Sequence, residues 1–446
     1  MSRKMKDSCV PWVGDIPEKW SAQSVKNLVE PGKNGIKIGP FGSALKGKTL
    51  DAGPVKIYNQ ANLISEDFDV SRHFVSEETF KELSAYQVFP GDILFSMMGT
   101  IGKCCQMPAN KQVGIMDSHL LKARLNSKIL PEFFIYAFDK DRNPSTFDQL
   151  MLLSKGSIMN GLNSEIVRKV KIAVPPINEQ HAIVSYLDSH CATIDSAISK
   201  HQQIIEKLEE YRKAVITQAV TNGLNPNVEM KDSGDSIIPI VPSHWLWTRV
   251  KFTVNVVRGG SPRPIEQYII GEKEDGYNWI KIGDATGGGK FIIATKQRIK
   301  PDGLNKTRLV HAGTLLLTNS MSFGHPYFLQ IDGCIHDGWL AFSDYKGVLP
   351  AFLYYYLMSE TTAHQFTTTA DGSVVQNLNI DKVRNSHIAL PPIVEQKAIV
   401  QYLDTVDGKI NTAIQHHNQI IEKLQEYKQS LIYNAVTGKI DCTTEA

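Results

Sequence analysis

The chain has 446 residues, of which 42% are hydrophobic and 21% are charged, a composition typical of a globular protein with roughly two to four domains. No apolar run approaches the ~18 residues of a membrane span, and no apolar stretch follows the amino-terminal charges, so neither a span nor a secretory signal is expected. The six cysteines lack the spacing of a zinc module or a disulfide framework, which fits a reducing cytoplasm. A formal net charge of +2 argues against a strongly basic nucleic-acid binder.

The sequence contains a long internal repeat. Residues 175–188 read PPINEQHAIVSYLD and residues 391–404 read PPIVEQKAIVQYLD, identical at 11 of 14 positions. At the same offset, IIEKLEEY returns as IIEKLQEY and AVT returns unchanged. Solenoid repeats have periods of about 20–50 residues, so a period this long indicates duplicated domains. The expected division is a variable domain at 1–174, a repeated helix at 175–224, a second variable domain at 225–390 and a second helix at 391–446.

The repeated segments have the pattern of long helices with a heptad seam. No Gly or Pro interrupts 179–221, and Asn222-Gly223 and Gly438 supply carboxyl-terminal stops. The seam is interrupted by polar or small residues at the same three places in both copies: Cys191 and Asp407, His201 and His417, and Arg212 and Lys428. The apolar seam residues are Leu187, Ile194, Ile198, Ile205, Leu208 and Val215 in the first helix, and Leu403, Ile410, Ile414, Ile421, Leu424 and Leu431 in the second.

The expected fold class is α+β, with two mixed α/β domains joined by the two long helices. Two similar domains on two similar helices favour pseudo-twofold symmetry, which requires an antiparallel coiled coil. In the variable domains, short apolar runs predict strands among Gly, Pro and Asn turns, and Pro at the first turn predicts a helix in each domain. The predicted strands are 55–58, 92–96, 279–282 and 314–318, and the predicted helices are 131–139 and 350–359.

Dividing the charge by segment weakens the objection to nucleic acid. The net charge is +5 for 1–174, −2 for 175–224, +1 for 225–390 and −2 for 391–446. The acidic helices therefore dilute a modestly basic first domain. Polar and basic turn residues are the candidates for contacts with a polyanion. They are Lys33, Lys37, Ser43, Lys46, Lys48, Asn59, Gln60, Lys103 and Lys155 in the first domain, and Arg258, Ser261, Arg263, Lys281, Asn319, His325 and Gln376 in the second.

Motifs for catalysis are weak or incomplete. Residues 42–49, GSALKGKT, match a phosphate-binding P-loop, but Gly53-Pro54 leaves no room for the helix that must follow. The tetrapeptides at 174–177 and 390–393 lack the residues that amino-group methylation of DNA requires. No catalytic residue and no metal site is predicted, so the chain is expected to be a non-catalytic recognition protein.

The duplicated PPI-x-EQ-x-AIV-x-YLD…IIEKL-x-EY…AVT pattern, each copy preceded by a Gly-Ser…Leu-Asn segment, closely resembles the specificity (S) subunits of type I restriction–modification systems. The moderately specific segments GPFGSALK and GD-I-L-F support this resemblance. The resemblance covers essentially the whole chain. It implies two target-recognition domains, each reading half of a bipartite double-stranded DNA site, on an antiparallel coiled coil that docks two methyltransferase (M) subunits.

The same resemblance implies motor-nuclease (R) subunits as further partners, no membrane and a cytoplasmic location. It implies no cofactor on this chain, with S-adenosylmethionine, ATP and Mg on the partner subunits. Because the two variable domains differ in sequence, we expect an asymmetric target. The chief alternative is a coiled-coil scaffold that binds proteins only and has no DNA affinity in any complex. A weaker alternative is a P-loop nucleotide-binding protein, which would bind ATP through Lys48.

Overall fold

A computed structural model describes residues 3–32, 35–40, 42–154, 162–271, 274–285, 289–319, 324–368 and 378–443. The chain divides into two units, one made of 1–201 and 419–446 and the other of 202–418, so each unit contains one variable domain and parts of both long helices. Within the described ranges, no helix is both long and apolar enough to cross a membrane.

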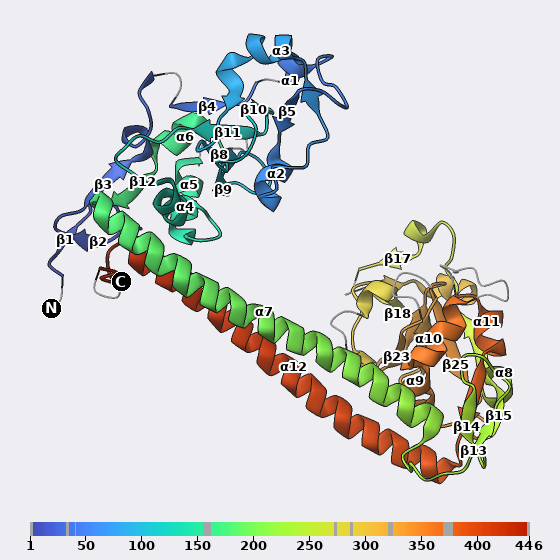
Figure 1. Cartoon of the computed structure of the whole chain (residues 1–446). Coiled ribbons are helices and arrows are strands. Elements are labelled where there is room, and N and C mark those ends of the chain that lie inside the picture. Colours follow the sequence, from blue (N-terminus) through green and yellow to red (C-terminus); the bar gives the residue numbers. More distant parts are fainter. Residues whose placement is uncertain are drawn as a thin grey trace. The chain divides into compact units, whose positions relative to one another are not determined.

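The first unit has two four-stranded sheets, in the orders β6-β5-β10-β7 and β4-β11-β8-β9 (Figure 1). Two smaller antiparallel pairs, β1 with β2 and β3 with β12, lie near the start of the first long helix. The strands are β1 (Met5–Asp7), β2 (Asp15–Pro17), β3 (Ser21–Ser24), β4 (Ile36–Ile38), β5 (Val55–Tyr58), β6 (Phe74–Val75), β7 (Gln87–Val88), β8 (Ile93–Ser96), β9 (Cys104–Gln106), β10 (Gly114–Met116), β11 (Leu120–Ala123) and β12 (Lys171–Val174). The helices of this domain are α1 (Gly42–Leu45), α2 (Gln60–Ser65), α3 (Glu77–Glu82), α4 (Pro131–Phe138), α5 (Pro144–Ser154) and α6 (Ser164–Lys169).

The second unit repeats this plan with five strands in each main sheet, in the orders β16-β25-β22-β23-β19 and β17-β20-β18-β24-β21. The strands are β13 (Met230–Asp232), β14 (Ile240–Pro242), β15 (Leu246–Arg249), β16 (Asn255–Arg258), β17 (Ile269–Ile270), β18 (Tyr277–Ile280), β19 (Phe291–Ile292), β20 (Arg298–Ile299), β21 (Arg308–Val310), β22 (Leu315–Thr318), β23 (Pro326–Leu329), β24 (Gly333–Ile335), β25 (Trp339–Ser343) and β26 (His387–Leu390). The helices are α8 (Val250–Thr253), α9 (Pro350–Met358), α10 (Glu360–Thr367) and α11 (Ile380–Asn385).

The predicted elements of the variable domains are present, with small shifts in their ends. Strand 55–58 and the helices beginning at Pro131 and Pro350 lie where the sequence predicts them. The strand predicted at 279–282 begins earlier, at Tyr277, and ends at Ile280, because residues 282–284 turn into a short 3-10 helix. Mixed strands and helices in both domains confirm the α+β class.

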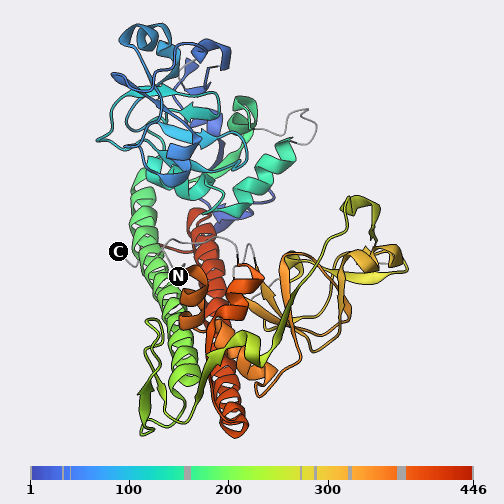
Figure 2. The ribbon, with the colours of Figure 1, turned by 90° about the vertical axis from the view of Figure 1, so that its right-hand side faces the viewer.

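The two long helices are α7 (Ile177–Asn222) and α12 (Ile393–Val436), and in each unit they lie side by side (Figures 1 and 2). In the first unit, Leu187 and Ile194 of α7 share a core with Leu431 and Ala435 of α12. The beginning of α7 therefore meets the end of α12, and the two helices run antiparallel there.

The second unit has the opposite ends of the same helices, also antiparallel. Ile216 and Val220 of α7 share a core with Ile399 and Leu403 of α12. The seam interruptions Arg212 and Asp407 form an ion pair, with Nε 3.0 Å from Oδ1. The predicted apolar seam residues are all buried or half-buried, and the most buried lie toward the ends of the helices.

A glutamate in each repeated EQ pair holds a buried tryptophan of its domain. In the first unit, Trp20 Nε1 donates to Glu179 Oε2 at 2.9 Å, and in the second, Trp245 Nε1 donates to Glu395 Oε2 at 2.9 Å. Each indole also covers the glycine that ends the other long helix: a Cβ on Gly438 would lie 3.0 Å from Trp20, and one on Gly223 would lie 3.1 Å from Trp245. Each tryptophan thus links the start of one helix to the end of the other.

The glutamine of each EQ pair satisfies main-chain groups of the adjacent domain. Gln180 accepts from Leu130 N at 2.7 Å and donates to two carbonyls at 2.9 Å. Gln396 accepts from Leu349 N at 2.8 Å and donates to two carbonyls at 2.8 Å. Both side chains are fully buried, and these bonds satisfy main-chain groups that would otherwise lack a partner. The repeated motif is therefore explained by attachment of each domain to its helix.

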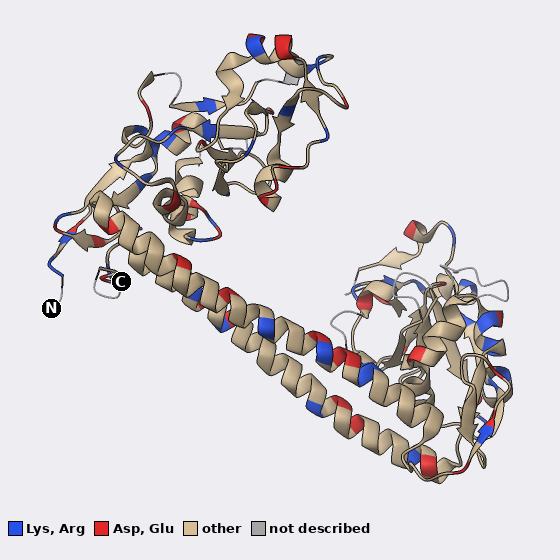
Figure 3. Cartoon of the chain, in the orientation of Figure 1, with Lys and Arg blue, Asp and Glu red and all other residues tan. Residues whose placement is uncertain are grey.

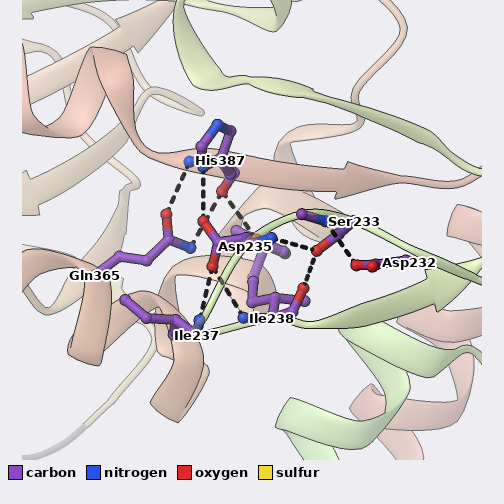
Figure 4. A network of polar contacts seen from close by, with 9 residues as sticks. Asp232, Ser233, Asp235, Ile237, Ile238, Gln365 and His387 are labelled. Atoms are coloured by element: carbon purple, nitrogen blue, oxygen red, sulfur yellow. Dashed lines mark hydrogen bonds and ion pairs between the residues drawn. The ribbon is translucent and has the colours of Figure 1, made fainter.

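A polar network holds the β13–β14 turn against β26 in the second unit (Figure 4). The Asp235 carboxylate contacts His387 Nδ1 at 3.0 Å and accepts from the main-chain N–H groups of Ile237 and Ile238. Gln365 Oε1 accepts from His387 N at 2.8 Å, as Gln149 Oε1 accepts from Lys171 N in the first unit. The network is a support of the fold and lies outside the candidate site described below.

Replacing Gly408 with Ala is expected to stabilise the protein. Gly408 lies inside α12, and a Cβ there would have no atom within 4 Å. Because Ala loses less conformational entropy in a helix, the free energy of unfolding should rise by about 0.5–1 kcal/mol, measured by chemical denaturation. Gly438→Ala is the control and should destabilise, because φ is +76° and its Cβ would lie 2.4 Å from Pro17.

Candidate nucleic-acid interface

In both domains the chain crosses from one main sheet to the other through a tight three-residue turn. Residues 117–119 join β10 to β11, and residues 336–338 join β24 to β25. A glycine lies against each turn: a Cβ on Gly39 would be 1.7 Å from Asp117 O, and one on Gly259 would be 2.2 Å from His336 O. The main chain after β4 or β16 can approach the turn this closely only because the residue is glycine. We call this place the crossover corner.

In the second domain, polar candidates gather at the crossover corner around Asp337. Ser261 Oγ donates to Asp337 Oδ1 at 2.8 Å, and Arg263 Nη2 lies 3.6 Å from Oδ2. The Asp337 carbonyl accepts from Arg258 Nε at 2.8 Å and from Asn319 Nδ2 at 3.0 Å. The segment 258–263 and Asn319, which are distant in sequence from each other, are therefore brought together by one turn.

The ionisation of Asp337 is set by these neighbours. Burial by itself raises the pKa of Asp337, but the hydrogen bond from Ser261 and the nearby positive groups outweigh it, so the pKa lies below its usual value. A carboxylate that stays ionised in this position holds Ser261 and attracts the Arg263 guanidinium.

His336 completes the turn as a neutral imidazole. Its Nδ1 accepts from Gly338 N at 2.9 Å, which leaves the proton on Nε2, 2.9 Å from Asp337 Oδ1. Burial lowers the pKa of His336, helped by Arg263, Lys281 and Arg258, although Asp337 opposes the shift. Three of the cationic candidates thus act on this ring through their charge.

Acidification should weaken the second domain through His336. Because the pKa of its imidazole is lower in the folded chain than its ordinary ~6.5, the unfolded chain takes up the proton first. The stabilising contribution is complete above that ordinary value and is lost as pH falls through the folded pKa. We expect the thermal unfolding midpoint of the wild type to fall more than that of His336→Gln between about pH 7.5 and 5.5. An equal fall in both proteins would contradict this assignment.

The other two described candidates of the second domain have separate places. Lys281 follows β18, and its Nζ donates to Gln297 Oε1 at 2.7 Å. His325 precedes β23, its ring lies 4.8 Å from that of Tyr327, and burial lowers its pKa. The charge of Lys281 lowers the pKa of His336, so Lys281 acts on the crossover corner electrostatically. His325 has no contact with Asp337 in the described part of the chain.

In the first domain, two candidates are used largely by the fold. Asn59 caps α2, and its side-chain oxygen accepts from Ala61 N at 2.9 Å and Asn62 N at 3.3 Å. Gln60 donates to Met98 O and, at 3.0 Å, to Thr100 Oγ1, which ties α2 to the loop after β8. These contacts leave less of either amide available to a ligand than the sequence alone indicates.

The lysines of the first domain are spread over several elements. Lys37 on β4 lies over the ring of Tyr86 at 5.1 Å, and Lys46 is exposed after α1. Lys48 pairs with Glu82 and is followed by a bridge from Leu50 to Phe74, so the helix that a P-loop requires does not start there. Lys103 Nζ lies 3.4 Å from Asp141 and lines a cavity of about 660 Å³ beside α7 and α12.

Three comparisons with known proteins agree with one another. The family model described as the type I restriction modification DNA specificity domain matches residues 35–210 and 263–425, more than half of the chain.

The chain belongs to this family.

Relatives of this specificity protein include the putative type I restriction enzyme MjaX specificity subunit of Methanocaldococcus jannaschii, 23% identical over 97% of this chain and 96% of the relative. The type I restriction enzyme EcoBI specificity subunit of Escherichia coli is 22% identical over 80% of this chain and 75% of the relative. Both are specificity subunits by name, in agreement with the expectation of a non-catalytic chain.

Solved structures share the fold of this specificity protein. A chain from a study of complex assembly and conformational transition of the type I R-M system superposes with a TM-score of 0.69, at 15% identity, over 95% of this chain and 99% of the other. The HsdS subunit from Thermoanaerobacter tengcongensis gives a TM-score of 0.51 at 16% identity, over 95% of this chain and 98% of the other.

Some predicted contacts of the specificity protein lie outside the described residues. These are Lys33, Lys155 and Gln376, and the side chain of Ser43. Conversely, His336 and Asp337 were missed by sequence reasoning, and so were Asp117 and His119, which contact each other at 3.3 Å in the equivalent turn of the first domain. The sequence does contain a signal for this turn. Residues 114–119 (GIMDSH) and 333–338 (GCIHDG) each begin with Gly and two apolar residues, and a His and an Asp follow. Among the described residues, no group of three or more His, Cys, Asp or Glu is placed to hold a metal ion.

Proposed function

We propose that this chain is the sequence-specific DNA-recognition subunit of a type I restriction–modification complex, with one variable domain for each half of a bipartite site. One observation carries the proposal: both units present an equivalent crossover corner on a domain tied to an antiparallel pair of long helices. Such a helix pair can hold two readers at a set separation, so that they engage grooves about one helical turn (~34–36 Å) apart.

The two half-sites are expected to differ. Equivalent positions of the crossover corner carry different chemistry, since Ile38 pairs with Leu121 in the first domain where Arg258 pairs with Leu340 in the second. Asn59 and Lys281 also follow equivalent strands. Different hydrogen-bonding groups select different base edges, so the target is asymmetric.

The candidate DNA contacts fall into two groups, exposed side chains and side chains held by hydrogen bonds. Exposed cations such as Lys46 and Arg263 suit phosphates, which give affinity without sequence information. Residues fixed at the crossover corner, including Arg258, Ser261 and Asn319, suit base edges or their support. Basic and acidic residues are interspersed over both domains (Figure 3), which supports weak DNA binding by the isolated chain and stronger binding in a complex.

The partners follow from the same proposal. Two methyltransferase subunits dock on the helices and domains, and motor-nuclease subunits join them, bringing S-adenosylmethionine, ATP and Mg as their own cofactors. The functional division of the chain is 1–174, 175–224, 225–390 and 391–446, with pseudo-twofold symmetry between its halves. A subunit that acts on cellular DNA in this way works in the cytoplasm.

Co-expression with the methyltransferase subunit of the same system tests the proposal. Methylated adenines are mapped across the host DNA, and one asymmetric bipartite sequence is expected to carry them. The purified complex should bind that sequence in preference to a scrambled duplex, with affinity that falls as salt rises. A complex that assembles but binds no DNA would favour the protein-binding scaffold instead. ATP binding by the isolated chain, abolished by Lys48→Ala, would favour the nucleotide-binding alternative.

A further inference from the structure

The guanidinium of Arg258 is fixed at one edge and open at the other. Arg258 is the last residue of β16, and its Nε donates to Asp337 O at 2.8 Å. Its own carbonyl accepts from Arg308 Nε at 3.1 Å, so main chain and side chain are both held. The structure gives Nη1 and Nη2 no hydrogen-bond partner among the described residues, and the side chain is exposed. The outer edge of the guanidinium is therefore available in a set orientation.

The support behind Arg258 is itself fixed. Asn319 Nδ2 donates to the same Asp337 carbonyl at 3.0 Å, and Asn319 N donates to Gly338 O at 2.9 Å. Asn319 is buried, and with Arg258, His336 and Asp337 it lines a cavity of about 270 Å³. A turn held from the side chain of Asn319 and from Ser261 does not need to reorganise when a ligand reaches the guanidinium.

Guanine is the base that matches this arrangement. Its O6 and N7 are adjacent acceptors in the major groove, and a guanidinium that offers two parallel N–H groups binds both. Arg263 makes a useful contrast, because its side chain is 79% exposed and its Nη2 lies 3.6 Å from Asp337, too far for a hydrogen bond. A loosely held cation of this kind suits a phosphate better than a base edge.

We propose that Arg258 reads a guanine in the half-site bound by the second domain, held for this task by the Asp337 carbonyl. The inference rests on the proposed function, because it requires the second domain to contact DNA. The equivalent strand position of the first domain is Ile38, so that domain has no arginine at this position.

The test uses the complex of full-length chain and methyltransferase subunits on its mapped site. Each guanine is replaced in turn by 7-deazaguanine, which lacks the N7 acceptor, and binding is measured. For the wild type, one guanine in one half-site should be sensitive, with affinity falling about 10- to 100-fold. Complexes carrying Arg258→Ala or Arg258→Lys should lose sensitivity at that guanine and keep it elsewhere. Arg249→Ala, at an exposed arginine on β15, is the matched control and should behave as the wild type.

The outcomes separate the two proposals. If wild type and Arg258→Ala are equally sensitive at every guanine, the guanine assignment is wrong. If Arg258→Ala weakens binding to all sequences uniformly, Arg258 contacts phosphate and the assignment is wrong as well. A half-site without guanine on the side of the second domain would overturn it too. If the wild-type complex shows no preference for any sequence, the proposed function itself fails.

Discussion

A complex carrying Gly259→Ala is expected to lose recognition of the half-site read by the second domain. A Cβ at position 259 would lie 2.2 Å from His336 O and 2.7 Å from Ile335 O, distances that folded proteins do not tolerate. Both obstacles are main-chain atoms of the crossover corner, so the strand end and the turn must separate. Separation moves Arg258 and Ser261 away from Asp337, and specific binding should weaken by roughly 10- to 100-fold.

The measurement is binding of the complex to its mapped site and to duplexes with one half-site scrambled. Gly283→Ala is the matched control, because a Cβ there would have no atom within 4 Å although the residue lies in the short helix after Lys281. Gly39→Ala should have the same effect on the other half-site, since its Cβ would lie 1.7 Å from Asp117 O. Equal binding by the Gly259 and Gly283 variants would show that the crossover corner does not hold the reading residues.

The helices and their direction were predictable from the sequence because they depend on regular local signals. A heptad pattern over forty-odd residues, with no Gly or Pro from 179 to 221 and with Gly408 as the one Gly of α12, defines each helix. The duplication favours the antiparallel pairing that each unit has. The partners of the polar residues that interrupt the heptad seam could not be predicted from the sequence. Arg212 meets Asp407 because of the register between two segments almost 200 residues apart, and the seam pattern alone does not fix that register.

The roles of the repeated Glu and Gln were equally hidden. In sequence they read as ordinary polar residues at the start of a helix, and the first-turn position favours Glu for its charge. In the structure, Glu179 and Glu395 accept from tryptophans more than 140 residues away, and Gln180 and Gln396 bond to main-chain groups of their domains. Long-range contacts of this kind determine which residues a motif contains, but they leave no local pattern in the sequence.

The candidate interface was predictable by residue type and only partly by position. Arg258, Ser261, Arg263 and Asn319 were singled out as polar turn residues, and the crossover corner brings them to one place. The turn that gathers them was missed, because the similarity of GIMDSH and GCIHDG is short and does not by itself reveal a change of sheet. Asn59 shows the opposite error, because its polar side chain was given too much weight as a DNA contact. A helix-capping position also selects a polar residue at a turn.

Trp245→Ala should cause a large loss of stability in the second unit. The side chain is 1% exposed, donates to Glu395 and covers Gly223 at the end of α7. Removing a buried indole costs about 3–5 kcal/mol of the free energy of unfolding. Trp245→Phe should cost less, because the ring volume is largely kept and the Glu395 carboxylate retains its contact with His244 Nε2 at 2.7 Å. Chemical denaturation with far-UV circular dichroism measures both.

Hydrogen exchange locates the effect. Because Trp245 joins the start of α12 to the end of α7, its loss should increase exchange near residues 216–223 and leave 183–194 protected. Trp20→Ala should do the reverse, increasing exchange near 431–438, since Trp20 covers Gly438 and binds Glu179. Trp247→Ala is the control: this half-buried ring stacks on His387 of β26 with centroids 5.0 Å apart. Uniform exchange along both helices in the Trp245 variant would mean that the repeated Trp–Glu contact does not hold the helix ends together.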